Sequence, residues 1–295
     1  PPTLAPAVPM LKHALFALLV LVSSACRADV SFESAHALVV DEASGQVLFE
    51  KDATTAAPIA SMTKLMTAMV VLDAKLAADE PIRIDRADLD TLKHTSSGVP
   101  VGATLSRGDM VQLALMSSDN HAAAALARTY PGGDTAFVAA VARKIAELNL
   151  EDTAIDEPTG LSPNNHATAH DMVKILKAAS DYPEIEQATR QPSQAIKVNG
   201  RARVFHNTNG LVGRPGWDIL LSKTGFTNEA GRCVTMRLQA AGRNILIVLM
   251  GAMATSERTL DAHNIQRWLG VPMPSASEHR TVLRKVRHIS PRRRR

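Results

Sequence analysis

The spacing of apolar residues changes twice along the chain. Residues 36–50 read as two strands around the turn Glu42-Ala-Ser-Gly45, because short apolar runs flank polar turn formers. A helical spacing then prevails, and from about residue 193 the pattern of strands returns. Helices are expected near residues 58–73, 106–116, 122–127, 135–148, 168–179 and 255–269, and further strands near 194–198, 202–205, 217–221, 233–238 and 245–250.

Strands at both ends with helices between them predict an antiparallel sheet built by both termini, with an all-helical region inserted in the middle. This is an α/β (α+β) class. The predicted domain spans residues 29–274, with its sheet region at about 31–58 and 190–270 and its helical region at about 59–189. The 295 residues are 45% hydrophobic but only 3% aromatic, so aliphatic side chains must fill a substantial core.

The first 28 residues predict a leader that ends in a cleaved export signal. Met10-Leu-Lys-His is a short basic region, residues 14–22 are apolar, and Ala25-Cys-Arg-Ala28 offers small residues for cleavage before Asp29. Such a short apolar run cannot span a bilayer, which needs about 20 residues. The alternative is a short core segment. The export interpretation predicts a periplasmic protein whose mature chain contains one cysteine and no internal disulfide.

Charge is concentrated at the carboxyl end. The whole chain carries +4, but residues 278–295 carry +7 and residues 1–28 carry +2, which leaves −5 for the body. The pI of about 9.2 therefore reflects the tail and does not indicate a nucleic-acid partner. The tail, residues 275–295, is either a disordered basic extension or a weak, salt-sensitive membrane contact, because its apolar residues would share one helix face: Val282, Leu283, Val286 and Ile289.

The stretch from Pro58 to Asp73 contains the first candidate catalytic residues. It is apolar almost all round from Met62 to Leu72, which predicts a buried helix. Ser61 and Lys64 lie three residues apart near its start and so on one face. Burying an ammonium is costly unless it is paired or loses its proton. Ser-x-x-Lys alone is common, and a capping serine with a lysine reaching solvent would explain it.

Two further motifs change that interpretation. Ser118-Asp-Asn120 lies between two predicted helices, and Lys223-Thr-Gly225 follows the predicted strand 217–221. Each alone fits a cap or a turn. In the order Ser-x-x-Lys, Ser-x-Asn, Lys-Thr-Gly, they form the set found in penicillin-binding proteins and class A β-lactamases.

Longer stretches resemble the low-molecular-mass D-alanyl-D-alanine peptidases over about residues 31–270, and above all their periplasmic D-alanyl-D-alanine endopeptidase type. The resemblance implies a β-lactamase/transpeptidase-like fold and a serine DD-peptidase that cuts peptidoglycan peptide cross-links. It also implies β-lactams as covalent inhibitors. The stretches that carry it are Ala60-Ser-Met-Thr-Lys-Leu-Met66, Met116-Ser-Ser-Asp-Asn120, Glu157-Pro-Thr-Gly-Leu-Ser-Pro163 and Ser222-Lys-Thr-Gly-Phe-Thr-Asn-Glu-Ala-Gly-Arg-Cys233.

The chemistry of a serine nucleophile fits this spacing. A serine hydroxyl is a weak nucleophile until a base removes its proton, so Ser61 needs a partner. Lys64 can be that base only if its pKa falls from about 10.4 towards neutrality. A buried helix face and a second cation, Lys223, would both lower it. Lys223, with Thr224 and Gly225, is also the candidate binding site for a substrate carboxylate.

The remaining candidates complete the reaction. Ser118 is expected to relay a proton to the leaving amine, and Asn120 to hydrogen-bond the substrate's peptide backbone. The resemblance implies an oxyanion hole made by the backbone N–H groups of Ser61 and Phe226.

Two alternatives compete with a DD-peptidase. A class A β-lactamase needs a glutamate in a Glu-x-x-Leu-Asn pattern, which residues 151–165 lack, so penicillin is expected to acylate and stay. A non-catalytic peptidoglycan-binding protein would not need the complete catalytic set. His166 and His170 have zinc-like spacing but no following Glu and no third ligand, so no metal or cofactor is expected. Endopeptidase and carboxypeptidase activity both fit, since both cut after D-alanine.

Overall fold

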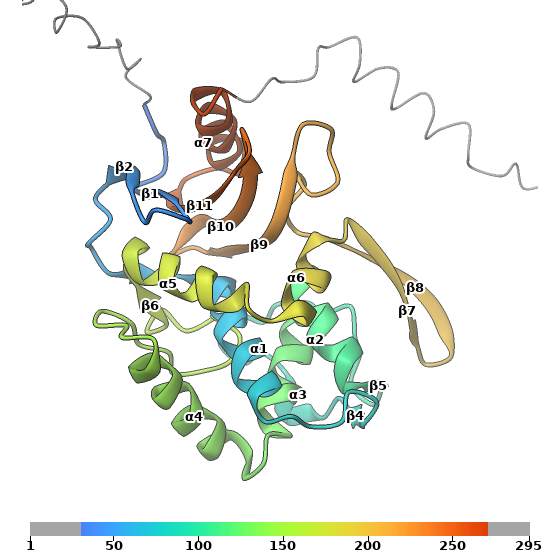
Figure 1. Cartoon of the computed structure of the whole chain (residues 1–295). Helices are drawn as coiled ribbons and strands as arrows, with labels where there is room; N and C mark the ends of the chain where they lie inside the picture. Colours follow the sequence, from blue (N-terminus) through green and yellow to red (C-terminus); the bar gives the residue numbers. More distant parts are fainter. Residues whose placement is uncertain (1–30, 271–295) are drawn as a thin grey trace, which may run out of the picture. The chain divides into compact units, whose positions relative to one another are not determined.

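A five-stranded antiparallel sheet, in the order β2-β1-β11-β10-β9, forms one layer of the computed structural model (Figure 1). The model describes residues 31–270, so the predicted leader and basic tail lie outside the described residues. Both ends of the described chain build the sheet, as predicted. Its strands are β1 (His36–Asp41), β2 (Val47–Lys51), β9 (Asp218–Thr227), β10 (Gly231–Ala240) and β11 (Arg243–Ala252).

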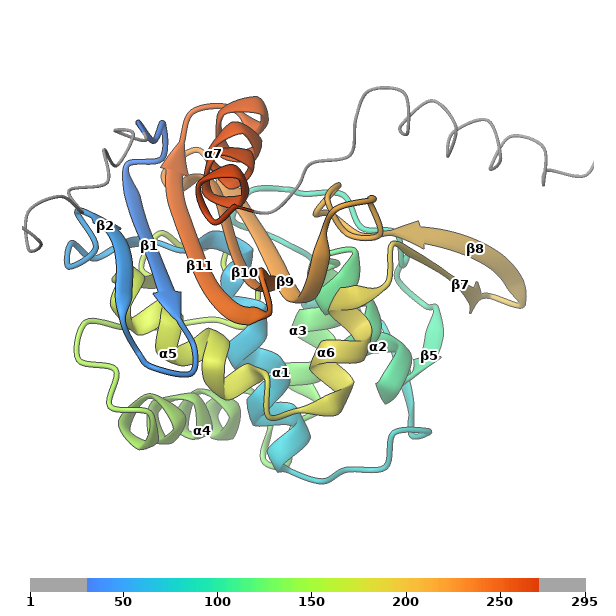
Figure 2. The same cartoon turned by 45° about the horizontal axis from the view of Figure 1, so that its top comes forward.

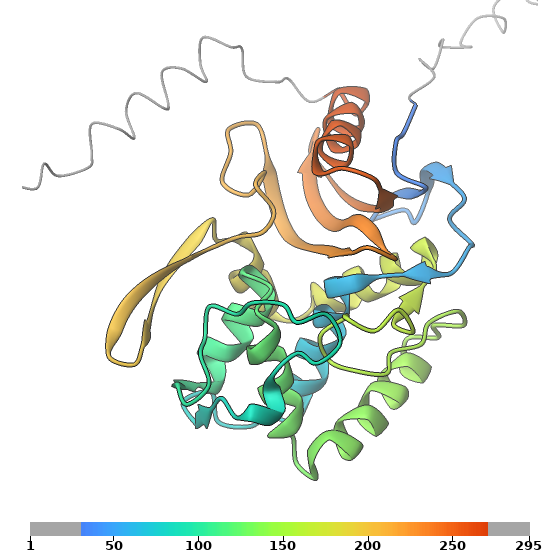
Figure 3. The same cartoon turned by 180° about the vertical axis from the view of Figure 1, so that it is seen from behind.

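Helices cover both faces of this sheet. Helix α7 (Thr255–Trp268) packs on β10 and β11, and α5 (Ala169–Ala179) packs on β1, β10 and β11. Figures 2 and 3 show α7 on one face, with α5 and the rest of the helical region on the other. Because both faces are covered, β11 reads as a continuous apolar run, and Ile245 to Met250 are all buried.

The helical region lies between β2 and β9 in the chain and surrounds α1. Helix α1 is buried from Lys64 to Val71, which agrees with its apolar sequence. Around it lie the 3₁₀ turns η1 (Ala60–Thr63) and η2 (Arg86–Asp88) and the helices α2 (Arg107–Met116), α3 (Asn120–Arg128), α4 (Gly133–Glu147) and α6 (Pro183–Arg190). Within residues 31–270, no helix is both long and apolar enough to cross a membrane.

Polar side chains set where the helices begin. Ser106 accepts a hydrogen bond from the N–H of Asp109 and caps α2, and Thr168 accepts from the N–H of Asp171 and caps α5. Asp119 caps α3 through the N–H of Ala122. The last cap matters for function, because it fixes the start of α3 within the Ser-Asp-Asn motif.

Three short two-stranded sheets complete the fold. They are β3 (Ala57–Pro58) with β6 (His166–Ala167), β4 (Pro81–Arg83) with β5 (Thr104–Ser106), and β7 (Ser193–Val198) with β8 (Arg201–His206). The β7–β8 hairpin is at the predicted place. It pairs only with itself and is not part of the main sheet, contrary to the expectation for residues after 190.

Three other details differ from the sequence prediction. Ser61 lies in the turn η1 and not in a continuous helix with Lys64. The Lys-Thr-Gly motif lies inside β9, which continues to Thr227, and does not follow the strand's end. Helix α6 was not predicted, because it is short and mostly polar and buries little more than Ile185 and Ala188.

Candidate active site

The turn that carries Ser61 is held by close backbone contacts. Ala60 has a positive φ of 46°, an uncommon conformation for a residue with a side chain. Gly160, with φ +83°, lies against it: a Cβ on Gly160 would come within 1.9 Å of the Ala60 carbonyl oxygen. Only glycine fits there, so the loop after α4 fixes the conformation of the residue before Ser61.

Lys64 lies at the centre of the site and is fully buried. Its Nζ is 2.8 Å from Ser61 Oγ, 2.7 Å from Asn120 Oδ1 and 2.6 Å from the carbonyl oxygen of Thr159. These three acceptors match the three protons of an ammonium. The expected contact between the serine and the lysine is therefore present, although a 3₁₀ turn and not an α-helical turn carries it.

Burial lowers the pKa of the Lys64 ammonium from its ordinary value of 10.5 to about 7. The carboxylates of Glu157, Asp119 and Asp90 act in the opposite direction, because a negative charge favours the protonated form. At neutral pH a substantial fraction of Lys64 therefore carries a free electron pair next to Ser61 Oγ.

Glu157 shapes the loop that faces Lys64. Its carboxylate accepts hydrogen bonds from the backbone N–H groups of Thr159 at 2.8 Å, Gly160 at 2.6 Å and Leu161 at 2.8 Å. Asn165 Nδ2 donates to it as well, at 3.0 Å. This arrangement directs the Thr159 carbonyl at Lys64. Sequence reasoning assigned neither Glu157 nor Thr159 a role, although both lie in a stretch that carried the resemblance.

Asn120 is held on its other side by a loop. Its Nδ2 donates to Thr95 Oγ1 at 2.7 Å, and the Thr95 hydroxyl donates to Asp90 Oδ2 at 2.8 Å. With Nδ2 committed to Thr95, Oδ1 faces Lys64. Asp90 and Thr95 are a second pair that sequence reasoning missed, because residues 90–95 carry no periodic pattern.

Ser118 and Lys223 form the second polar pair of the site. Lys223 Nζ donates to Ser118 Oγ at 2.8 Å and to the carbonyl oxygen of Thr224 at 2.9 Å. Burial, together with the charges of Lys64 and Arg258, holds the pKa of Lys223 well below its usual range. Ser118 itself has a positive φ of 59°, which turns the chain sharply between α2 and α3.

Strand β9 approaches Ser61 at Gly225. A Cβ on Gly225 would come within 2.8 Å of the carbonyl oxygen of Ile59 and 3.1 Å of the Ser61 nitrogen, so a side chain would push the strand away. This contact is a physical reason for glycine in the Lys-Thr-Gly motif. It also places the backbone of Phe226 one residue from the point of contact with Ser61.

Ser61 and Ser118 both line one hollow of about 250 Å³. Two arginines line it that sequence reasoning did not single out: Arg258, which is buried, and Arg232, whose guanidinium lies 3.5 Å from the ring centroid of Phe226. The lining residues are Ser61, Ser118, Thr208, Thr224, Gly225, Phe226, Arg232, Thr255 and Arg258. The predicted site residues thus come together from η1, α1, α3 and β9.

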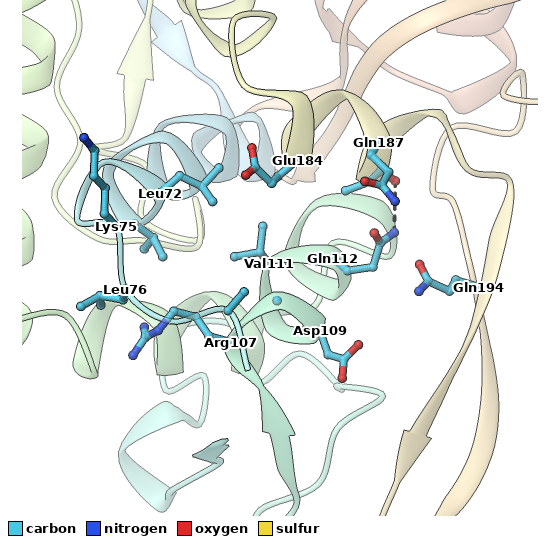
Figure 4. A pocket seen from close by; sticks show the side chains of 14 residues that line it. Leu72, Lys75, Leu76, Arg107, Asp109, Val111, Gln112, Glu184, Gln187 and Gln194 are labelled. Carbon is cyan, nitrogen blue, oxygen red and sulfur yellow. Dashed lines mark hydrogen bonds between the residues drawn. The ribbon is translucent and has the colours of Figure 1, made fainter. Parts of the chain in front are cut away.

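A larger hollow of about 460 Å³ lies between the carboxyl end of α1 and the helices α2 and α6 (Figure 4). Leu72, Leu76 and Val111 form an apolar part of its wall, and Gln112 donates to the carbonyl of Ala188 beside it. None of the predicted site residues lines it. The smaller hollow, which Ser61 and Ser118 line, is therefore the candidate active site.

The histidine pair considered as a metal site has other partners. His166 Nδ1 lies 2.8 Å from the carbonyl oxygen of Asn164, and His170 Nε2 lies 3.4 Å from Glu50 Oε1. Among residues 31–270, no group of three or more His, Cys, Asp or Glu is placed to hold a metal ion.

Similarity to known proteins agrees with this site. The family model of D-alanyl-D-alanine carboxypeptidases matches residues 22–254. The chain is 43% identical over 238 residues to the D-alanyl-D-alanine endopeptidase of Pseudomonas aeruginosa, covering 80% of this chain and 77% of the relative. It is 41% identical over 250 residues to the D-alanyl-D-alanine endopeptidase of Escherichia coli, covering 83% and 81%.

The fold agrees as well. The crystal structure of the Streptomyces K15 DD-transpeptidase matches with a TM-score of 0.75 at 23% identity, covering 82% of this chain and 99% of that one. The predicted β-lactamase/transpeptidase-like fold and the predicted family are thereby confirmed. The chain belongs to the D-alanyl-D-alanine carboxypeptidase family and is a serine DD-peptidase.

Proposed function

We propose that this peptidase works through an acyl-enzyme on Ser61, with neutral Lys64 as the general base. One observation carries the proposal: a fully buried lysine, with a pKa of about 7, lies 2.8 Å from the serine hydroxyl. Deprotonated Nζ takes the hydroxyl proton as Oγ attacks the carbonyl carbon of the substrate's D-alanine. Asn120 and the Thr159 carbonyl hold the lysine in place and accept hydrogen bonds from the ammonium that forms.

The second pair is proposed to complete acylation. When the C–N bond breaks, the leaving amine needs a proton. Ser118 is proposed to relay to it, through its hydroxyl, the proton that Lys64 took from Ser61. Lys223, which donates to Ser118 Oγ, stabilises that hydroxyl and attracts the carboxylate of the leaving group. Thr224 and Gly225 line the hollow beside it. The backbone N–H groups of Ser61 and Phe226 are proposed to stabilise the tetrahedral oxyanion.

The same geometry disfavours β-lactamase activity. Rapid deacylation of penicillin in class A enzymes relies on a glutamate that activates water. Glu157 lies in the loop that faces Lys64, but backbone N–H groups and Asn165 occupy its carboxylate. A penicilloyl ester on Ser61 is therefore expected to be long-lived, and penicillin to be an inhibitor.

We further propose a preference for cross-linked peptides over free D-alanyl-D-alanine ends. Both relatives above 40% identity are named D-alanyl-D-alanine endopeptidases, which supports it. The test is mass spectrometry of purified muropeptides after digestion, with Ser61→Ala as the control. Conversion of cross-linked dimers to monomers supports an endopeptidase. Loss of only the terminal D-alanine from pentapeptides would indicate a carboxypeptidase, and no product would favour a peptidoglycan-binding role.

The proposed site of action is the periplasm. The export signal of residues 1–28 and the peptidoglycan substrate support it. Cell fractionation with amino-terminal sequencing of the mature protein tests it. The expected result is a periplasmic chain that begins at or near Asp29, and a chain retained in the cytoplasm would contradict it.

A further inference from the structure

Residues 187–217 differ in charge from the rest of the body. They contain five lysines and arginines and no aspartate or glutamate, although the body as a whole, residues 29–277, carries −5. Outside this segment, the body therefore has ten more acidic than basic residues. The five cations are Arg190, Lys197, Arg201, Arg203 and Arg214, and all five are exposed.

Three of these cations lie on the β7–β8 hairpin. The turn Asn199-Gly200 has positive φ at both residues, 50° and 76°, which is the geometry of a tight two-residue hairpin. The hairpin pairs only with itself and projects beyond the helical region in all three views (Figures 1, 2 and 3). Lys197, Arg201 and Arg203 are thus displayed on an extended arm.

The cations of the hairpin are not used in ion pairs. Within residues 31–270, none of Lys197, Arg201 and Arg203 has a carboxylate within 4.0 Å, unlike Lys93, which pairs with Glu229. Arg203 donates to the carbonyl oxygen of Gly98 at 2.6 Å, which leaves its charge uncompensated. The strand register places Arg201 and Arg203 on one face of the hairpin and Lys197 on the other, because successive side chains of a strand alternate. Like charges without counter-charges on one arm favour an anionic partner.

The hairpin is also connected to the catalytic site. Gly98, which accepts from Arg203, donates its N–H to Asp119 Oδ2 at 2.9 Å, within the Ser-Asp-Asn motif. The chain that leaves β8 reaches Thr208, which lines the catalytic hollow and lies 2.6 Å from Thr224, hydroxyl to hydroxyl. The base of the hairpin therefore lies close to the catalytic hollow, and its free end extends away from it.

We propose that the β7–β8 hairpin is a binding surface for the carboxylate groups of peptidoglycan stem peptides. The inference rests on the proposed substrate, whose peptides carry free carboxylates at regular intervals along the mesh. Each exposed charge pair is weak and screened by salt. Several pairs repeated along one polymer act together, so the hairpin holds the enzyme on the insoluble mesh near cross-links.

Co-sedimentation of the full-length protein with purified insoluble peptidoglycan tests this role. All proteins carry Ser61→Ala, so that the mesh is not digested. The hairpin variant is Lys197→Gln with Arg201→Gln. The matched control is Arg86→Gln with Lys177→Gln, which removes two exposed cations from elsewhere on the body. A second mesh, with its carboxylates converted to amides, and anionic phospholipid vesicles complete the set.

The expected result is a rise of about tenfold in the dissociation constant of the hairpin variant at low salt, against less than twofold for the control. The parent protein, which carries Ser61→Ala alone, should bind the amidated mesh as weakly as the hairpin variant binds the intact mesh. Equal binding by the hairpin and control variants would overturn the proposal. So would undiminished binding of the parent to amidated mesh, or a loss confined to vesicles, which would assign the hairpin to a membrane surface.

Benzylpenicillin acylation of the same variants with Ser61 restored separates this proposal from the proposed function. The hairpin variant should be acylated at the parental rate, because the two substituted side chains lie outside the catalytic hollow. If Ser61 were not the nucleophile, the adduct would map to another residue or be missing in every protein, whereas the difference in mesh binding would still be measured.

Discussion

The pH dependence of acylation is the most informative consequence of the buried Lys64. Since only its neutral form can take the Ser61 proton, the rate should rise with pH and level off above the pKa. The largest cause of the lowered pKa is burial, and the carboxylates of Glu157, Asp119 and Asp90 oppose it. Two perturbations test this balance: Lys64→Arg, which keeps the charge and cannot lose it, and Asp90→Asn, which removes one opposing carboxylate.

The magnitude follows from the pKa. At pH 7, a lysine with its ordinary pKa of 10.5 is neutral in about one molecule in 3,000, whereas a lysine with a pKa of about 7 is neutral in about half. The environment therefore contributes about a thousandfold to the supply of active base. Lys64→Arg should lose at least that factor. Asp90→Asn should move the midpoint to lower pH, because losing a negative charge destabilises the protonated ammonium.

The assay is the second-order rate constant of acylation by benzylpenicillin between pH 5 and 9. We expect about a tenfold fall per pH unit below pH 6 and a plateau above pH 8. Thr95→Ala serves as a control for loss of the loop contact to Asn120, since Asp90 also holds Thr95. A rate independent of pH through this range, or a Lys64→Arg variant with most of its activity, would refute the role of Lys64 as base.

Three further outcomes are expected. Gly225→Ala should slow acylation at least tenfold and lower the melting temperature, because the new Cβ would lie 2.8 Å from the Ile59 carbonyl; wild-type values for both would contradict the contact. Thr95→Val should slow acylation by the factor that corresponds to about 1–3 kcal/mol, and Thr95→Ser, which keeps the hydroxyl, should restore the acylation rate. In an Asn120→Ala background, neither substitution should change that rate. Lys223→Ala should slow the hydrolysis of substrates with a carboxylate next to the scissile bond more than the hydrolysis of neutral analogues. Equal losses for both substrates in steady-state kinetics would show that Lys223 does not bind the carboxylate.

Much of the fold could be predicted from the sequence, because its strands and helices carry strong periodic patterns. The apolar runs of the strands β1, β10 and β11 end at turn residues, and the helix expected near residues 168–179 is α5, which begins after its cap Thr168. Cys233 begins the predicted strand 233–238 and is buried in β10. The catalytic motifs could be recognised from the sequence, because a serine that acts as a nucleophile needs a base nearby, which restricts the residue types at the positions of Ser61 and Lys64.

The remaining features depend on tertiary contacts that periodicity does not report. The 3₁₀ turn at Ser61 follows from the approach of Gly160 to Ala60, about one hundred residues apart in the sequence. Lys64 donates to the backbone carbonyl of Thr159, so the side chain at position 159 does not reveal this contact in the sequence. The hydrogen bonds to Glu157 direct that carbonyl at Lys64. A separate hairpin and two strands of a larger sheet have the same alternation of residues, which is why β7 and β8 were expected in the main sheet.

The most direct measurement of the central claim is intact-mass spectrometry after incubation with benzylpenicillin, followed by peptide mapping. The position of Ser61, 2.8 Å from the Nζ of Lys64, leads us to expect one covalent adduct per chain, located on Ser61 and absent from Ser61→Ala. An adduct that persists in Ser61→Ala, or that maps to Ser118, would contradict the assignment of the nucleophile.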